Sequence, residues 1–124
     1  MLWRAIEMAR NHDSGGRVRV IAIALDKRGR VISVGKNNYT RSHPLAKRFA
    51  EKHGIPEKDR VHAELKAVLG CRGQVISTLI VARVDREGNV CDGKPCKCCQ
   101  SMLEWVEKLQ ESKIDIVYSK GEKQ

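Results

Sequence analysis

The sequence predicts an α/β fold, a three-layer α/β/α sandwich with a central mixed sheet of about four strands. Segments whose apolar residues recur at helical spacing alternate along the chain with short apolar runs that are typical of strands. Such an alternation packs helices on the faces of one sheet. The chain has 124 residues and no internal repeat, so we expect a single domain over residues 1–124.

The first half of the chain predicts one helix and a β-hairpin. Residues 2–12 place apolar side chains on one face of a helix. Residues 18–25 are an apolar run rich in β-branched side chains, and residues 26–29 are typical of a turn. Residues 30–35 should therefore return as the hairpin partner, followed by a loop over residues 36–44.

The second half predicts strands separated by helices. Apolar residues recur at helical spacing after Pro95, and residues 85–94 have the Gly and Asp content of a loop. Asp59 is a suitable N-cap for the helix that follows it. The expected elements are a short basic helix at 45–53, a helix at about 61–70, a strand at 76–84, a helix that starts at Pro95 and a strand at 114–118.

A Pro-Cys-Lys-Cys-Cys motif at residues 95–99 predicts a metal site. Cys96 and Cys99 are three residues apart, so their thiols share one face of a helical turn. Pro95 suits the first turn of that helix, because its fixed φ is helical and its missing N–H is not needed there. The positive end of the helix dipole favours thiolates at this position, which helps them to bind a cation.

A His-Ala-Glu tripeptide earlier in the chain, at residues 62–64, completes the site. His62, Cys96 and Cys99 would leave a tetrahedral zinc with one open position, where water binds in catalytic zinc sites. Glu64 is two residues from His62, and at the start of a helix both can converge on a target beyond the helix end. Glu64 would then lie beside the water and would not bind the metal.

Two other interpretations of the cysteines remain open. Cys96 and Cys99 could form a thioredoxin-like dithiol. A purely structural zinc could instead take Cys91 or Cys98 as its fourth ligand. Cys98 is two residues from Cys96 and points away from it on a helix, whereas the loop that carries Cys91 leads directly into the motif.

The composition limits the environment and the partners. The chain carries 24 basic and 15 acidic residues, for a net charge of +9, which fits a phosphorylated or polyanionic partner. A solvated basic surface would explain the same excess. No apolar run is long enough to cross a membrane. Five cysteines, three of them within four positions, suit a reducing compartment, so we expect a cytoplasmic protein without membrane attachment.

Taken together, the motifs resemble those of the cytidine deaminase superfamily, in particular small deoxycytidylate deaminase-like proteins. The resemblance extends from the first helix to the last strand. It implies the cytidine deaminase fold. The motifs that carry it are Gly35-x-Asn37, His62-Ala63-Glu64 and Pro95-Cys96-x-x-Cys99.

The resemblance implies a Zn²⁺ cofactor bound by His62, Cys96 and Cys99. Zinc would lower the pKa of its water to about 7, so that hydroxide is available to attack the carbon that bears the exocyclic amine. Glu64 would take the proton of that water, pass it to the ring nitrogen and then protonate the departing ammonia. Glu64 is thus the expected catalytic residue.

Substrate contacts are expected from residues around the two motifs. In this superfamily the residue that matches Asn37 touches the sugar or the base, although an ordinary turn explains an Asn at this position as well. Ala63 and Pro95 belong to the motifs themselves and are expected to line the same pocket. Lys36 and Arg41 lie in a basic segment that suits a 5′-phosphate or a polynucleotide backbone.

The favoured function is hydrolytic deamination of cytosine to uracil in a nucleotide such as dCMP or CMP, with release of ammonia. The alternative is a deaminase that acts on cytosine or adenine within single-stranded DNA or RNA, tRNA included. A third reading is a zinc-stabilised nucleic-acid-binding module without catalysis, and the intact Glu64 speaks against it.

The chain departs from the superfamily near its C-terminus, where it ends six residues after Tyr118. The usual last helix and fifth strand would then be absent. The sheet edge left at this point predicts a homo-oligomer, most simply a symmetric dimer, because exposed edges are usually covered or paired.

Overall fold

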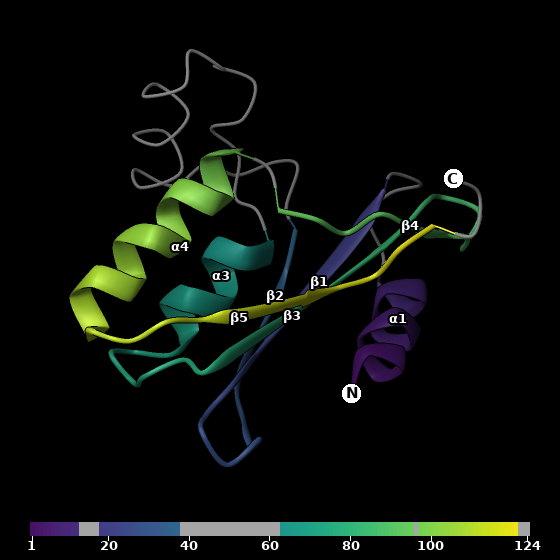
Figure 1. Ribbon diagram of the computed structural model, residues 1–124. Coiled ribbons are helices and arrows are strands. Elements are labelled where there is room, and N and C mark those ends of the chain that lie inside the picture. Colours follow the sequence, from purple (N-terminus) through teal and green to yellow (C-terminus); the bar gives the residue numbers. More distant parts are fainter. Residues whose placement is uncertain (13–17, 38–62, 96, 122–124) are drawn as a thin grey trace.

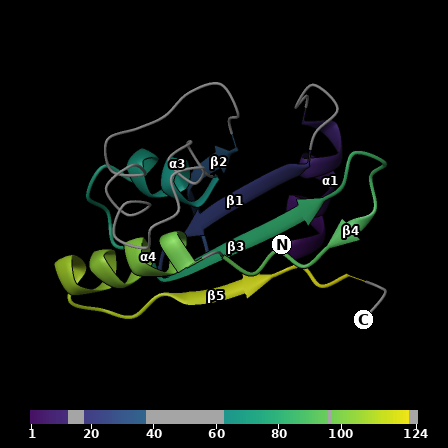
Figure 2. The same cartoon turned by 90° about the horizontal axis from the view of Figure 1, so that it is seen from above.

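The computed structural model describes residues 1–12, 18–37, 63–95 and 97–121. These residues form three layers (Figure 1 and Figure 2). Helix α1 (Leu2–Asn11) covers one face of a five-stranded sheet, and helices α3 (Ala63–Gly70) and α4 (Lys97–Gln110) cover the other. The expected α/β/α sandwich is confirmed.

The sheet is mixed, as expected. Strands β2, β1 and β3 are neighbours in that order and pair antiparallel. The other edge of β3 is shared by two strands: β5 pairs parallel with its first half, and β4 pairs antiparallel with its end. The strands are β1 (Arg19–Leu25), β2 (Val31–Lys36), β3 (Thr78–Val84), β4 (Val90–Cys91) and β5 (Asp115–Tyr118).

Strand β4 corrects the sequence prediction, which placed only a loop at residues 85–94 and about four strands in the sheet. The Asp85 carboxylate accepts hydrogen bonds from the backbone N–H groups of Glu87 and Asn89, each at 2.9 Å. This turn brings the chain back beside β3, where residues 90 and 91 pair with residues 84 and 83. A strand of two residues carries no periodicity that the sequence could reveal.

Each face of the sheet has its own apolar core. On one face, Ala5 and Ala9 of α1 are fully buried against a cluster that includes Ile21, Ile23 and Ile80. Two alanines let the helix approach the strands closely, since neither side chain extends beyond Cβ. The core on the other face joins α3 and α4 to the sheet through residues such as Leu65, Leu79, Val81, Met102 and Leu103.

The remaining boundaries agree with expectation within one or two residues. The expected basic helix at 45–53 and the Asp59 cap lie outside the described residues. The helix expected at about 61–70 is described from Ala63 onward. Helix α4 follows Pro95, with its first described residue at Lys97.

The topology brings several element ends together. Strand β2 runs parallel to β3, because both are antiparallel to β1. Helices α3 and α4 both run in the direction opposite to β3. Helix α3 leads into the start of β3, and α4 carries the chain back from the end of β3 to the start of the parallel strand β5. Both helices therefore begin at the end of the sheet where β2 and β3 finish (Figure 1).

Candidate metal centre

The first turn of α3 lies directly on β2, at Gly35. A Cβ atom at this glycine would overlap the carbonyl oxygen of Ala63 and come within 2.5 Å of the Ala67 backbone nitrogen. Both neighbours are backbone atoms of α3, which cannot swing aside as a side chain can. Gly35 therefore sets how closely the helix that starts at the His-Ala-Glu motif approaches the sheet.

The chain that enters α4 is held by a buried serine. Ser119, directly after β5, is 1% exposed. Its hydroxyl donates to the carbonyl oxygen of Cys91 at 2.7 Å and accepts from the backbone N–H of Arg83 at 3.0 Å. The backbone N–H of Gly93 donates to the Ser119 carbonyl at 2.8 Å. Ser119 thus joins the ends of β3, β4 and β5 to the segment that leads into the cysteine motif.

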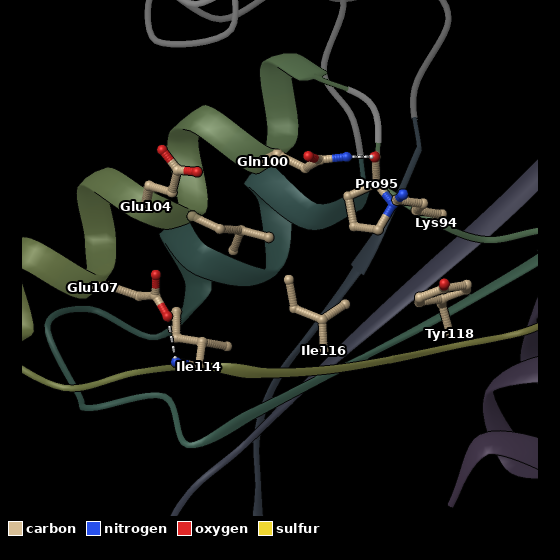
Figure 3. A pocket seen from close by; sticks show the side chains of 9 residues that line it. Lys94, Pro95, Gln100, Glu104, Glu107, Ile114, Ile116 and Tyr118 are labelled. Atoms are coloured by element: carbon tan, nitrogen blue, oxygen red, sulfur yellow. Dashed lines mark hydrogen bonds between the residues drawn. The ribbon is translucent and has the colours of Figure 1, made fainter.

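A second contact lies at the motif itself. Pro95 is buried, and its carbonyl oxygen accepts a hydrogen bond from the side-chain amide of Gln100 at 2.7 Å (Figure 3). Gln100 directly follows Cys99, so this bond joins the residue before the motif's first cysteine to the residue after its last one.

Glu64 and Cys99 occupy equivalent places in the two helices. Each lies in the first turn of its helix, and the two helices begin at the same end of the sheet. Glu64 is 5% exposed and Cys99 is 4% exposed. A carboxylate is rarely buried without a compensating charge or hydrogen bonds, so the fold has to support Glu64 at this position.

The residues that flank these two positions fit a zinc site. His62 and Cys96 lie outside the described residues; within the part of the chain that is described, no group of three His, Cys, Asp or Glu side chains could hold a metal. In the sequence, His62 directly precedes Ala63, and Cys96 lies between Pro95 and Lys97. One imidazole and two thiolates form a donor set that suits zinc and leaves one position open.

The other cysteines are distributed over the fold. Cys91 lies in β4, half-buried, with its thiol 3.5 Å from the carbonyl oxygen of Asn89. Cys71 follows α3 and is buried; its thiol donates to the Ala67 carbonyl at 3.2 Å, and burial raises its pKa. Cys98 lies in α4, and its side chain is outside the described part of the structure.

The expected substrate residues are placed at the same end of the sheet, with one exception. Lys36 is exposed at the end of β2, and Ala63 is buried at the start of α3. Asn37 follows Lys36, and its side chain accepts from Val20 N and donates to the Val18 carbonyl, both at 3.0 Å. These bonds leave one N–H and one lone pair of the amide for another partner. Arg41 lies outside the described residues.

Sequence reasoning missed two residues that shape this region, Ser119 and Gln100. Both act through side-chain bonds to backbone groups, and nothing in the local pattern of a Ser or Gln reveals such a partner. Gly35, in contrast, carried a signal in the sequence, because a glycine inside a strand often marks a bulge or the close approach of another backbone.

Comparison with known families identifies the chain. Residues 1–113, from α1 through α4, match the model of the cytidine and deoxycytidylate deaminase zinc-binding region. The chain belongs to this family of zinc-dependent deaminases, and Zn²⁺ is its cofactor. A search of curated proteins found no match. In the described part of the structure, no helix has the length and apolar character needed to cross a membrane.

Proposed function

We propose that this protein deaminates cytosine in a nucleotide such as dCMP or CMP, with zinc held by His62, Cys96 and Cys99 and with Glu64 as the proton carrier. The observation that supports this most directly is the burial of Glu64 and Cys99 in the first turns of two helices that begin at the same end of the sheet. Family membership supports the reaction type.

In this mechanism, bound zinc supplies Lewis-acid activation of a water molecule. Glu64 accepts the proton of that water and delivers it to the ring nitrogen of the base. The carboxylate then takes a second proton, from the hydroxyl group now bonded to the carbon, and delivers it to the amino group, which leaves as ammonia while the C=O bond forms. Burial of Glu64 excludes bulk water from this proton transfer, so that the proton stays within the site.

The substrate side of the site is proposed to contain Asn37, Ala63 and Pro95, with Lys36 and Arg41 near the phosphate. Lys36 is exposed next to Asn37, at the sheet end where both helices begin. Its ammonium can meet a 5′-phosphate while the remaining N–H and lone pair of the Asn37 amide meet the sugar or the base.

The alternative proposal, a deaminase of single-stranded DNA or RNA, draws on the net charge of +9. Several phosphates bound at once would release several counterions, so binding would weaken steeply with added salt. A mononucleotide would show a much weaker dependence.

A substrate panel separates these possibilities. We would incubate the zinc-loaded protein with dCMP, CMP, the two nucleosides and single-stranded oligonucleotides, and measure ammonia release. The nucleotide proposal predicts that dCMP is converted much better than deoxycytidine. Oligonucleotides that outperform every mononucleotide would favour the alternative, and salt-sensitive binding without any turnover would leave a zinc-stabilised binding module.

Two charge variants test the phosphate contact. Lys36→Glu should raise KM for dCMP at least tenfold and leave KM for deoxycytidine unchanged, because only the nucleotide carries the phosphate. Lys27→Glu makes the same charge change at the tip of the β1–β2 hairpin, at the other end of the sheet, and should alter neither value. If both variants raised KM for dCMP equally, a local contact between Lys36 and the phosphate would be contradicted.

Glu64→Gln tests the proton carrier, because it keeps the shape of the side chain and removes its basicity. We expect full zinc content and a loss of kcat of at least about a hundredfold. Glu104→Gln, on the exposed side of α4, is the matched control and should keep full activity. A Glu64→Gln variant with near wild-type kcat would exclude this role.

We further propose that the protein self-associates as a symmetric dimer in the cytoplasm. Among the described strands, β5 and β2 each pair on one side only, with β3 and with β1, and Val117 of β5 is 42% exposed. An exposed edge of this kind invites pairing. Sedimentation at micromolar concentration tests this, and a monomer would contradict it.

A further inference from the structure

Gln100, near the start of α4, makes a hydrogen bond that differs from those usually found at the start of a helix. The first turn of a helix has backbone N–H groups without partners, so side chains there normally accept hydrogen bonds. Gln100, the fourth described residue of α4, instead donates its amide N–H to the Pro95 carbonyl, which lies before the helix. The bond therefore does nothing for the free N–H groups of α4. It fixes the direction from which the chain enters the helix.

This contact joins the two ends of the sequence segment that contains both cysteines of the motif. Pro95 directly precedes Cys96, and Gln100 directly follows Cys99. The 2.7 Å bond between them joins the two ends of this segment. Because Pro95 is also buried, the carbonyl that accepts the bond has little freedom to move.

The bond is partly buried and borders a pocket. Pro95 and Gln100 form one end of a pocket of about 290 Å³ between α4 and β5, with Leu103, Ile116 and Tyr118 among its apolar lining residues. Figure 3 shows the Gln100 side chain extended along the rim of this pocket toward Pro95. A partly buried hydrogen bond meets less competition from water than a fully exposed one.

We propose that Gln100 is a positioning residue for the zinc site: its bond to Pro95 holds the segment that contains Cys96 and Cys99 in the geometry that the metal requires. The proposal rests on the proposed ligand pair Cys96 and Cys99. Groups that orient metal ligands without touching the metal commonly change metal affinity or activity by 10- to 100-fold when they are removed.

Helix α4 offers a matched control at its other end. Gln110 also ties the helix to backbone groups outside it: its side chain donates to the Ile76 carbonyl at 2.8 Å and accepts from the Ile76 N–H at 3.0 Å. Gln100→Met and Gln110→Met thus remove the same functional group from the same helix. Only the first lies next to the cysteines.

The experiment measures zinc release to a chromogenic chelator together with the absorption spectrum of the Co²⁺-substituted protein. Gln100→Met should release zinc at least about tenfold faster than wild type and change the thiolate-to-cobalt bands. Gln110→Met should match wild type in both measurements while it lowers the melting temperature. If Gln100→Met does not fold, Gln100→Glu keeps the shape of the side chain, removes the donor and should give the same result.

Wild-type release and an unchanged cobalt spectrum in Gln100→Met would overturn the proposal. Equal acceleration in Gln110→Met would overturn it as well, since general loosening of α4 would then explain the effect. A Cys99→Ala variant that still binds zinc as tightly as wild type would instead refute the ligand set, which distinguishes failure of the proposed function from failure of this inference.

Discussion

The start of α3 and the start of α4 carry the two halves of the proposed zinc site, and they are held by different forces. At α3, the backbone of the first turn packs against β2 at Gly35, with no room for a Cβ atom. At α4, hydrogen bonds from Ser119 and Gln100 fasten the segment that precedes the helix. One half of the motif therefore depends on steric fit and the other on polar contacts.

The difference determines how each half responds to change. Packed backbone atoms cannot yield without moving the whole helix, so a single added methyl group disrupts the contact. A substitution usually removes only one or two hydrogen bonds, and a water molecule or a small movement of the backbone can satisfy part of the polar groups that lose their partner. We therefore expect one substitution at the start of α3 to cause a large loss of stability and of zinc binding, and one substitution at the start of α4 to cause only a partial loss.

Gly35→Ala should produce the largest effect. The added methyl group overlaps α3 and should lower the free energy of unfolding by about 3 kcal/mol or more, and zinc content should fall because the helix that follows His62 is displaced. Urea unfolding and metal analysis measure the two consequences.

Gly29→Ala is the control for this change. Gly29 has a φ of +79° and nothing within 4 Å of an added Cβ, so its substitution costs only the backbone strain of about 1 kcal/mol and leaves zinc content intact. If Gly35→Ala were no more disruptive than Gly29→Ala, steric fit would not be what holds α3.

Ser119→Ala should have a smaller effect at the α4 end. The variant leaves the Cys91 carbonyl and the Arg83 N–H without their partner, at a cost of about 1–3 kcal/mol in the free energy of unfolding. Zinc should still bind, with faster release to a chelator. Ser112→Ala removes an exposed hydroxyl that accepts from Gln110 and should change neither quantity, and a Ser119→Ala protein devoid of zinc would contradict the expected partial loss.

The smallest expected effect is on the pH dependence of stability, and it arises from two similar turns, at Asp26 and Asp85. Each carboxylate accepts two backbone N–H bonds of 2.9 Å, and hydrogen bonds to Arg30 and to Asn89, respectively, lower the pKa of each aspartate. A lowered folded-state pKa contributes stability that is present above the ordinary aspartate pKa of about 4 and is lost as the pH falls through the folded-state value.

Asp26→Asn and Asp85→Asn should each flatten the fall of the melting temperature below about pH 4. The amide oxygen can still accept the backbone bonds, so both proteins should remain folded at neutral pH. Only the Asp85 turn lies between β3 and the entry to α4, so only Asp85→Asn should alter zinc release. If zinc is released at the same rate from both variants, the Asp85 turn does not help to hold the start of α4.

The sequence predicted the layers of the fold and most elements, because the apolar runs of β1 and β3 and the helical spacing in α1 and α4 are long enough to be unambiguous. It failed at β4, whose two residues are set by the Asp85 turn. In the site, residue type and spacing pointed to Glu64 and Cys99, which the structure buries. Ser119 and Gln100 escaped prediction because their partners depend on the three-dimensional course of the chain.

The β1–β2 turn offers a practical attachment point. Residues 27–30 are exposed, and the turn closes on itself through the Asp26 carboxylate. It projects from the end of the sheet opposite to the starts of α3 and α4 (Figure 1). Exposed turns of this kind tolerate added segments. A fluorescent label or an immobilisation tag inserted there would leave the end of the molecule that carries the proposed site facing the solution.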